Sequence, residues 1–161
     1  MLLHLLGNEF SQQEIETNYH YYEKRTLHGS SLSPSIYAIM GLKVGDDSKA
    51  YRYLRRAAML DLLNLQHNTR EGIHAANAGG VWQTVVFGFA GVNMDDDGVL
   101  SITPHMPHEW SSLTFRLHNR ERGSRFVSMR PWCSMWRCLT DRRHLRINGE
   151  TVTVPGARTV S

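Results

Sequence analysis

Two stretches decide the fold of the first half of this chain: Thr26-Leu-His-Gly-Ser-Ser-Leu-Ser-Pro34 and Asn68-Thr-Arg-Glu-Gly-Ile-His-Ala-Ala76. Each is a turn rich in small polar residues that opens an apolar pattern of helical spacing. Together they place the hydroxyls of Ser30 and Ser31 and the imidazole of His74 at or near helix N-termini. A helix N-terminus has unpaired N–H groups and about half a positive charge, so it readily binds an anion. Two such termini that face one pocket would suit a phosphate.

Around these turns the first half reads as four helical segments, each marked by apolar residues three or four positions apart. They are predicted at residues 1–6, 34 to 41 or 45, about 47–64 and about 68–89. The third should bury a face formed by Leu54, Ala57, Ala58 and Leu62. The fourth should bury the stripe Trp82, Val85, Val86 and Phe89. Gly79 and Gly80 each cost a helix interior about 1 kcal/mol relative to alanine, which indicates that another backbone or a ligand comes close there.

The second half changes character at Gly91-Val-Asn-Met-Asp-Asp-Asp-Gly98. Runs typical of strands follow at 99–103, 113–117, 145–148 and 151–154. The last two flank Gly149-Glu150, which predicts a hairpin. The sequence therefore predicts a mainly α domain at 1–93 and a β domain at 94–161.

Composition limits the class of protein. Apolar residues make up 41% of the chain and charged residues 20%, values that are ordinary for a soluble globular protein. No apolar run approaches the roughly 20 residues that span a bilayer, and the first six residues lack the features of a secretory signal. We therefore expect a cytoplasmic protein with no membrane partner. Ten arginines against seven acidic residues in 94–161 give the excess positive charge, but no recognised nucleic-acid motif accompanies them, so nucleic-acid binding is not expected.

Three further patterns resemble metal or redox sites, and we interpret each as structural. His105-Met-Pro-His108 is interrupted by proline and lacks a third ligand, which favours a surface loop. Asp95-Asp-Asp-Gly98 lacks the alternating ligands and the later glutamate of a calcium loop, which favours a solvated turn. Cys133 and Cys138 form neither a disulfide framework nor a zinc pattern, so free thiols are expected. We expect no metal site and no cofactor.

Several motifs occur in one order along the first 118 residues. They are Tyr21-Tyr-Glu-Lys-Arg-Thr-Leu-His-Gly-Ser-Ser-Leu-Ser-Pro-Ser-Ile36, Asp61-Leu62, Asn68-Thr-Arg-Glu-Gly-Ile-His-Ala-Ala76, Gly79-Gly-Val-Trp82, Gly88-Phe-Ala-Gly91, Pro104-His-Met-Pro-His-Glu-Trp110 and Leu113-Thr-Phe-Arg116. In this order they resemble glycoside hydrolase family 65, which includes maltose, kojibiose, nigerose and trehalose phosphorylases and some related hydrolases. The resemblance implies the last helices of an (α/α)6 barrel, followed by an incomplete C-terminal β-sandwich.

The resemblance also implies a site. Ser30, Ser31 and His74 would bind inorganic phosphate as co-substrate, with Gly72 and Ile73 offering backbone near the helix start. The other substrate would be an α-linked glucose disaccharide. In the implied mechanism a protonated glutamate donates its proton to the glycosidic oxygen, while phosphate attacks the anomeric carbon from the opposite face in place of the water of an inverting hydrolase. A cationic His74 suits this anion. Because a hydrolase needs a carboxylate base at these positions, a phosphorylase is favoured.

Other parts of the family pattern are not found in these 161 residues. They are the N-terminal β-sandwich, the earlier barrel helices with the catalytic glutamate, and a sugar-binding Lys-Gln-Ala-Asp motif that would lie just before Met1. We therefore expect a fragment that is inactive alone, exposes apolar faces, and forms homo-oligomers or needs a complementing upstream polypeptide. A non-catalytic remnant and a trehalose- or kojibiose-type hydrolase remain alternatives.

Residues 119–144 depart from the family pattern of alternating strands. They have no clean period of two, yet they contain both cysteines and two of the four tryptophans. An alternating pattern returns at Leu145. We hypothesise a frameshifted or decayed stretch between two intact ends. An uninterrupted, error-free reading frame on resequencing would count against it.

Overall fold

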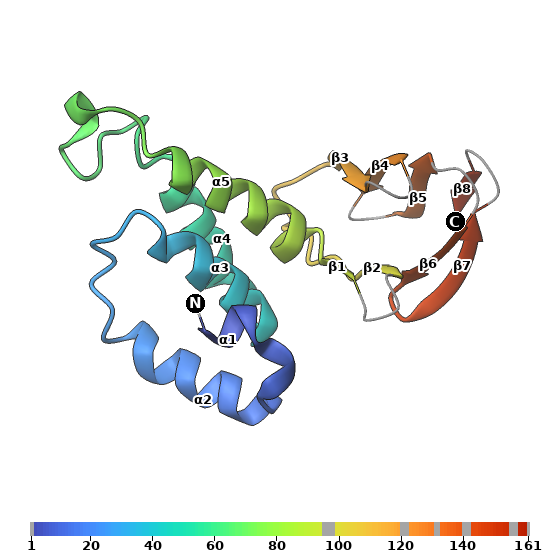
Figure 1. The fold of residues 1–161 in the computed structure, drawn as a ribbon, viewed down its shortest axis with the longest axis horizontal. Coiled ribbons are helices and arrows are strands. Elements are labelled where there is room, and N and C mark those ends of the chain that lie inside the picture. The colour runs from blue at the N-terminus through green and yellow to red at the C-terminus, as the bar shows by residue number, and fades with distance from the viewer. Residues whose placement is uncertain are drawn as a thin grey trace. The chain divides into compact units, whose positions relative to one another are not determined.

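The computed structural model describes residues 2–94, 99–119, 123–130, 133–139, 143–154 and 158–160. The chain divides into two compact units, Met1–Gly88 and Phe89–Ser161. Helices fill the first unit and strands the second (Figure 1), which confirms the predicted succession of a mainly α part and a β part. Within the described residues, every helix is too short or too polar to cross a membrane.

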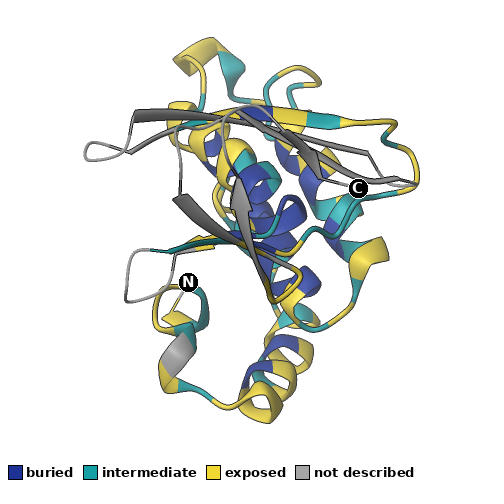
Figure 2. Ribbon diagram, turned by 90° about the vertical axis from the view of Figure 1, so that its right-hand side faces the viewer, coloured by how far each residue is buried: buried dark blue, intermediate teal, exposed yellow. Residues whose placement is uncertain are grey.

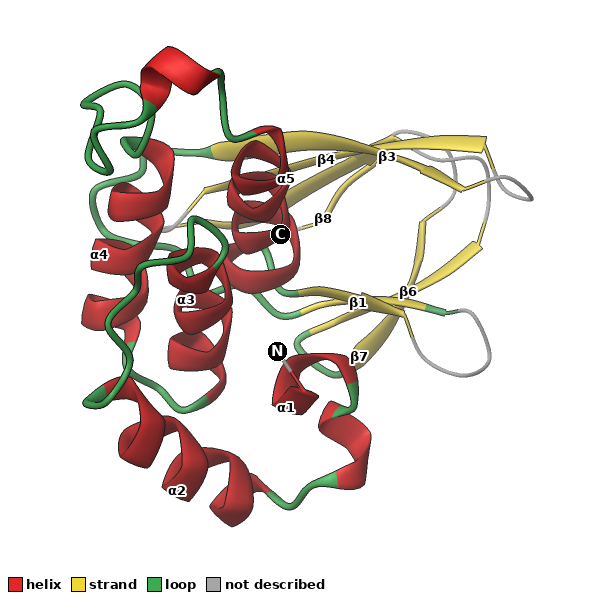
Figure 3. Ribbon diagram, turned by 60° about the vertical axis from the view of Figure 1, so that its left-hand side comes forward, coloured by secondary structure: helices red, strands yellow, loops and turns green. Residues whose placement is uncertain are grey.

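In residues 2–88 the structure describes five α-helices. They are α1 (Leu2–Leu5), α2 (Gln12–Glu23), α3 (Ser33–Lys43), α4 (Asp47–Ala58) and α5 (Ala75–Gln83). Short 3-10 turns form at Gly7–Glu9 and Thr69–Glu71, and a π-helix at Thr84–Phe89 continues α5. Helices α3, α4 and α5 pack against one another (Figure 3). Their buried residues form the core of this unit together with Val86 of the π-helix, and buried residues are dark blue in Figure 2: Ala38, Ile39, Leu42, Ala50, Leu54 and Ala57.

Helix α2 is not predicted by the spacing of apolar residues, because it buries only Ile15 and Tyr19. Its start signal is nevertheless in the sequence. The Ser11 hydroxyl oxygen accepts from the Glu14 backbone N–H at 3.3 Å, and the Glu14 carboxylate accepts from the Ser11 N–H at 2.8 Å. This capping box satisfies two N–H groups that would otherwise be unpaired. Ile15 and Tyr19 then pack with Met40 of α3.

Helix α4 ends at Ala58 and is shorter than the predicted segment 47–64. Beyond it, Asn64 and His67 have positive φ angles of 47° and 57°, which a right-handed helix does not contain. The predicted buried face is therefore wrong in its second half. Ala58 is exposed, and Leu62 is 77% exposed.

The helix predicted at 68–89 is interrupted. Gly72 has a φ of 121°, so the 3-10 turn ends there and α5 begins only at Ala75. The prediction of Trp82 as a core residue is wrong, because it is 48% exposed and contacts the Phe87 ring edge-on. Phe89 is buried as predicted. The change to π-helical pitch at Thr84 breaks the spacing on which the stripe was based.

The predicted close approach at the two glycines is found at one of them. A Cβ on Gly80 would lie 2.8 Å from Ser35 Oγ, whereas Gly79 has no neighbour within 4 Å. The neighbour is a side chain of α3, neither a backbone nor a ligand. Thr84 Oγ1 adds hydrogen bonds to the Ser35 carbonyl at 3.2 Å and the Gly80 carbonyl at 2.9 Å. Gly80 therefore allows α5 to pack closely on α3.

The described residues of the second unit form two four-stranded sheets. The first contains, in spatial order, β1 (Val92–Met94), β2 (Leu100–Ile102), β6 (Arg143–Ile147) and β7 (Glu150–Val154). The second contains β3 (Leu113–Asn119), β4 (Gly123–Arg130), β5 (Cys133–Leu139) and β8 (Arg158–Val160). Strands β2 and β6 are parallel, and the other neighbouring strands are antiparallel.

The predicted hairpin forms, with its turn one residue earlier than expected. Ile147 pairs with Glu150, and the turn residues Asn148 and Gly149 have φ angles of 48° and 86°. Positive φ at both central positions is what a type I′ turn requires. Strands β4 and β5 fall within 119–144, so the absence of alternation there did not exclude strands. The frameshift hypothesis concerns the gene and stays a prediction.

Candidate phosphate site

The turn at residues 26–34, here called the serine turn, connects α2 to α3. The Ser30 carbonyl accepts from the Ser33 N–H at 3.2 Å, and Ser30 Oγ accepts from the Leu32 N–H at 3.3 Å. The turn therefore leads directly into α3, in which Pro34 is the second residue. Ser30 is exposed and Ser31 is half-buried. Within the described part of the chain, Ser31 Oγ has no hydrogen-bond partner, so its hydroxyl can turn toward a ligand.

His74 is the N-cap residue of α5, and Asp61 holds it by two hydrogen bonds. His74 Nδ1 lies 2.5 Å from Asp61 Oδ1, and the His74 backbone N–H donates to Asp61 Oδ2 at 2.8 Å. The side-chain bond from His74, followed by the backbone bond, lowers the pKa of Asp61. An ionised carboxylate only accepts, so Nδ1 carries a proton and the ring orientation is fixed. Sequence reasoning identified His74 but assigned no role to Asp61.

The second ring nitrogen of His74 faces Asn68. Asn68 Nδ2 lies 3.3 Å from His74 Nε2, a long hydrogen bond. Asn68 Oδ1 is buried and has no partner among the described residues. An anion bound to a protonated Nε2 would take the place of this contact with the amide. The amide itself would be a second N–H donor beside the anion.

Gln66 joins the two turns. Its Nε2 donates to the Gly29 carbonyl at 3.0 Å, across 37 positions of sequence. Gly29 directly precedes Ser30, and Gln66 lies two residues before Asn68. The serine turn is thus linked by one hydrogen bond to the segment that leads into the histidine turn, residues 68–76. Gln66 was not singled out from the sequence, and Asn68 was quoted only as the start of the histidine turn, because a lone amide in a loop carries no spacing signal.

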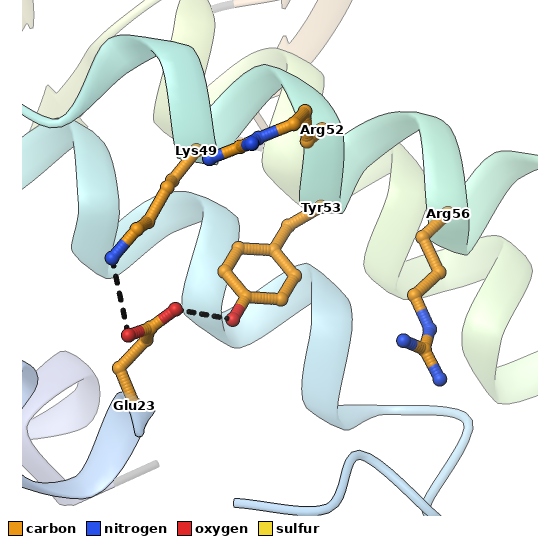
Figure 4. Close-up of a pocket in the computed structure, with 5 residues that line it drawn as sticks. All are labelled: Glu23, Lys49, Arg52, Tyr53 and Arg56. Atoms are coloured by element: carbon orange, nitrogen blue, oxygen red, sulfur yellow. Dashed lines mark hydrogen bonds and ion pairs between the residues drawn. The ribbon is translucent and has the colours of Figure 1, made fainter.

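A cavity of about 250 Å³ lies between the end of α2 and α4, and its lining does not include the predicted site residues. It is lined by Glu23, Lys49, Arg52, Tyr53 and Arg56. Figure 4 shows Lys49 and Tyr53 directed at the Glu23 carboxylate, with distances of 3.1 Å and 3.0 Å. This carboxylate is therefore already paired.

The remaining predicted residues have simpler surroundings. The Gly72 N–H donates to the Thr69 carbonyl at 3.2 Å, so it closes a turn, and its role toward phosphate stays a prediction. His108 is exposed and lies 3.6 Å from Glu109. Among the described residues no group of three histidine, cysteine or acidic side chains could hold a metal. Asp95–Gly98 and the side chains of Cys133 and Cys138 lie outside the described residues.

Comparison with known proteins places the chain in a family. Residues 1–83 match the glycosyl hydrolase family 65 central catalytic domain, and residues 94–125 match the C-terminal domain of that family. The chain is 54% identical over 117 residues to a kojibiose phosphorylase of Thermoanaerobacter brockii, which covers 73% of this chain and 15% of that protein. It is 45% identical over 113 residues to an α,α-trehalose phosphorylase of Geobacillus stearothermophilus, covering 70% of this chain and 15% of that protein.

A solved structure is also similar. It is provisionally assigned as a kojibiose phosphorylase from the human microbiome, and it superposes with a TM-score of 0.87 at 30% identity, covering 99% of this chain and 23% of that one. The chain thus spans about a seventh of the length of these two curated relatives. With residues 1–83 matched to the catalytic domain and residues 94–125 to the C-terminal domain, the chain belongs to glycosyl hydrolase family 65.

Proposed function

We propose that the serine turn and the histidine turn together hold inorganic phosphate for the phosphorolysis of an α-linked glucose disaccharide. The observation that carries this proposal is the pair of hydrogen bonds from His74 to Asp61, which orients an imidazole at the start of α5. The Gln66 bridge to Gly29 supports it, because it ties that region to the turn with the two hydroxyls. Relatives that are phosphorylases of kojibiose, trehalose and maltose give the reaction class.

In the proposed reaction the phosphate is the nucleophile. Ser30 and Ser31 donate hydroxyl hydrogens to phosphate oxygens, and His74 donates from Nε2 as an imidazolium. A phosphate oxygen forms a bond to the anomeric carbon as the glycosidic C–O bond breaks on the opposite face. A protonated glutamate, which the family resemblance assigns to an earlier barrel segment, gives its proton to the leaving oxygen. The products are glucose 1-phosphate and the free sugar.

The same geometry argues against a hydrolase. An inverting hydrolase needs a free carboxylate to activate water. The carboxylate beside His74 belongs to Asp61, and each of its oxygens accepts a hydrogen bond from His74. Asp61 is therefore engaged as an orienting group. The proposed setting is an (α/α)6 barrel in which α3 and α5 carry the site, with a β-sandwich formed by the second unit.

The test is release of glucose 1-phosphate from kojibiose, trehalose, maltose and nigerose. The full chain is assayed alone and together with a polypeptide that supplies the rest of the Thermoanaerobacter brockii kojibiose phosphorylase. We predict no release from the chain alone and phosphate-dependent release from the assembled pair. The variant S30A/S31A should abolish it, whereas S48A, at an exposed serine of α4, should not. Release of free glucose without phosphate, or full activity of S30A/S31A, would contradict the proposal.

A further inference from the structure

His28 lies two residues before Ser30 and has the backbone conformation that side chains rarely adopt. Its φ is 51°, and such a residue persists only where its surroundings hold it. Its ring Nδ1 lies 2.8 Å from Ser33 Oγ, and its Nε2 lies 3.0 Å from the Tyr53 hydroxyl. The ring also packs edge-on against Tyr37, with centroids 4.9 Å apart. One side chain of the turn is thus bonded both to the first residue of α3 and to α4.

The hydrogen-bond chain beyond Tyr53 fixes where the protons are. The Tyr53 hydroxyl donates its single hydrogen to the Glu23 carboxylate at 3.0 Å, and Lys49 Nζ donates to the other carboxylate oxygen at 3.1 Å. Having used its hydrogen, the Tyr53 oxygen must accept from His28 Nε2–H. A neutral ring then has a bare Nδ1, which accepts from the Ser33 hydroxyl.

The charges around His28 agree with a neutral ring. Burial, and then the nearby guanidinium of Arg56 on α4, lower the pKa of His28, although the Glu23 carboxylate at the end of α2 acts to raise it. Burial and the hydrogen bond to Glu23 raise the pKa of Tyr53, so it keeps the hydrogen it donates. Burial acts to raise the pKa of Glu23, but the hydrogen bonds from Lys49 and Tyr53 outweigh it and the pKa is lowered. Tyr37 on α3 faces the ring as well.

We propose that His28, as the neutral Nε2–H tautomer, is a positioning residue that holds the turn carrying Ser30 and Ser31 through the chain Ser33, His28, Tyr53, Glu23 and Lys49. The inference rests on the proposed phosphate site. Ser33 transmits the effect, because its backbone N–H donates to the Ser30 carbonyl at 3.2 Å. The ring does not touch phosphate itself. Its contribution is to keep the two hydroxyls at one place at the start of α3.

The first measurement is the imidazole nitrogen NMR spectrum of the full chain at pH 7.5, with His28 assigned by the spectrum of H28N. Asparagine is the control because it tolerates positive φ but is too short to reach Tyr53. We expect a protonated Nε2 and an unprotonated Nδ1, with the Nε2 proton protected from exchange. In Y53F that protection should be lost, whereas in Y22F, at an exposed tyrosine of α2, it should remain. A protonated Nδ1 or a charged ring overturns the assignment.

The second measurement is the affinity of the same proteins for inorganic phosphate. Y53F and H28N should weaken binding about three- to tenfold, the size of one lost hydrogen bond, and Y22F should not change it. H28Q, whose amide N–H can reach toward Tyr53, should recover part of the loss. Unchanged phosphate affinity in Y53F, with the His28 ring disturbed, overturns the positioning role alone. Absence of phosphate binding in the unsubstituted chain overturns the proposed function instead.

Discussion

The histidine turn and the serine turn precede neighbouring helices of the same unit, but they are held in different ways. At the histidine turn the functional side chain is itself clamped, because Asp61 accepts from both the ring and the backbone of His74. At the serine turn the functional hydroxyls make little contact, and His28 carries the structural bonds. An imidazole must present one nitrogen in a fixed direction, whereas a hydroxyl can rotate to meet its ligand. The ring of His74 is therefore held in one orientation, whereas at Ser30 and Ser31 the position of the turn is held and the hydroxyls can rotate.

The largest expected effect comes from D61N. Asparagine offers one acceptor oxygen to the two N–H groups of His74, so either the ring or the backbone loses its partner. We expect phosphate affinity to fall about 10–100-fold, the range typical when the orienting partner of a metal-binding imidazole is removed. Isothermal calorimetry measures it. D47N, at an exposed carboxylate of α4, is the matched control. If D47N weakened phosphate binding as much as D61N, the role of Asp61 in orienting His74 would be contradicted.

A smaller effect is expected where the helices behind the two turns touch. G80A would place a methyl group 2.8 Å from Ser35 Oγ, which should lower the free energy of unfolding by about 1–3 kcal/mol. G79A has open space and should instead raise it by up to about 1 kcal/mol, because alanine favours a helix. Urea unfolding separates the two. S35G in the G80A background should restore part of the loss, and destabilisation by both glycine variants would mean that close packing is not the reason.

The smallest expected effects are losses of stability with falling pH, which should begin at different pH values for the two turns. A group whose pKa is lower in the folded than in the unfolded chain stabilises the fold at pH values above its ordinary pKa. This stabilisation is lost as the pH falls, because the unfolded chain then binds more protons than the folded chain. Because the pKa of His28 is lowered from 6.5, the serine turn should lose stability as the pH falls below that value. Because the pKa of Asp61 is lowered from 3.8, the histidine turn should lose stability only when the pH falls below that value. When the free energy of unfolding is measured against pH, H28N should remove the loss of stability that begins below pH 6.5. D61N should remove the loss that begins below pH 3.8. If both variants changed the same pH range, the two turns would not be held separately.

Sequence reasoning located both turns because each combines small polar residues with the start of an apolar helical pattern. It quoted Asp61 and Asn68 within motifs but gave them no role, and it passed over Gln66, because all three act across loops and leave no periodic signal. It extended the third helix to 64 because leucines continue at helical spacing, although Asn64 and His67 adopt positive φ. Trp82 was placed in the core on spacing alone, and the π-helical turn after it changes that spacing.

Strand prediction depended on alternation and on turn residues. The hairpin of β6 and β7 was predicted from Gly149-Glu150 between two strand-like runs, and the turn itself forms one residue earlier, at Asn148-Gly149. Strands β4 and β5 were missed because their residues do not alternate between polar and apolar types. Helix α2 was missed for a related reason: it buries few residues, and only its capping box announces it.

The most direct test of the central claim is a phosphate titration of the full chain followed by NMR. If both turns hold one anion, the amides of Ser30 and Ser31 and the ring of His74 will shift with the same midpoint, and S30A/S31A will remove the response at His74 as well. Nitrate at matched ionic strength serves as the control. Shifts confined to one turn, or two different midpoints, would contradict a single phosphate site built from Ser30, Ser31 and His74.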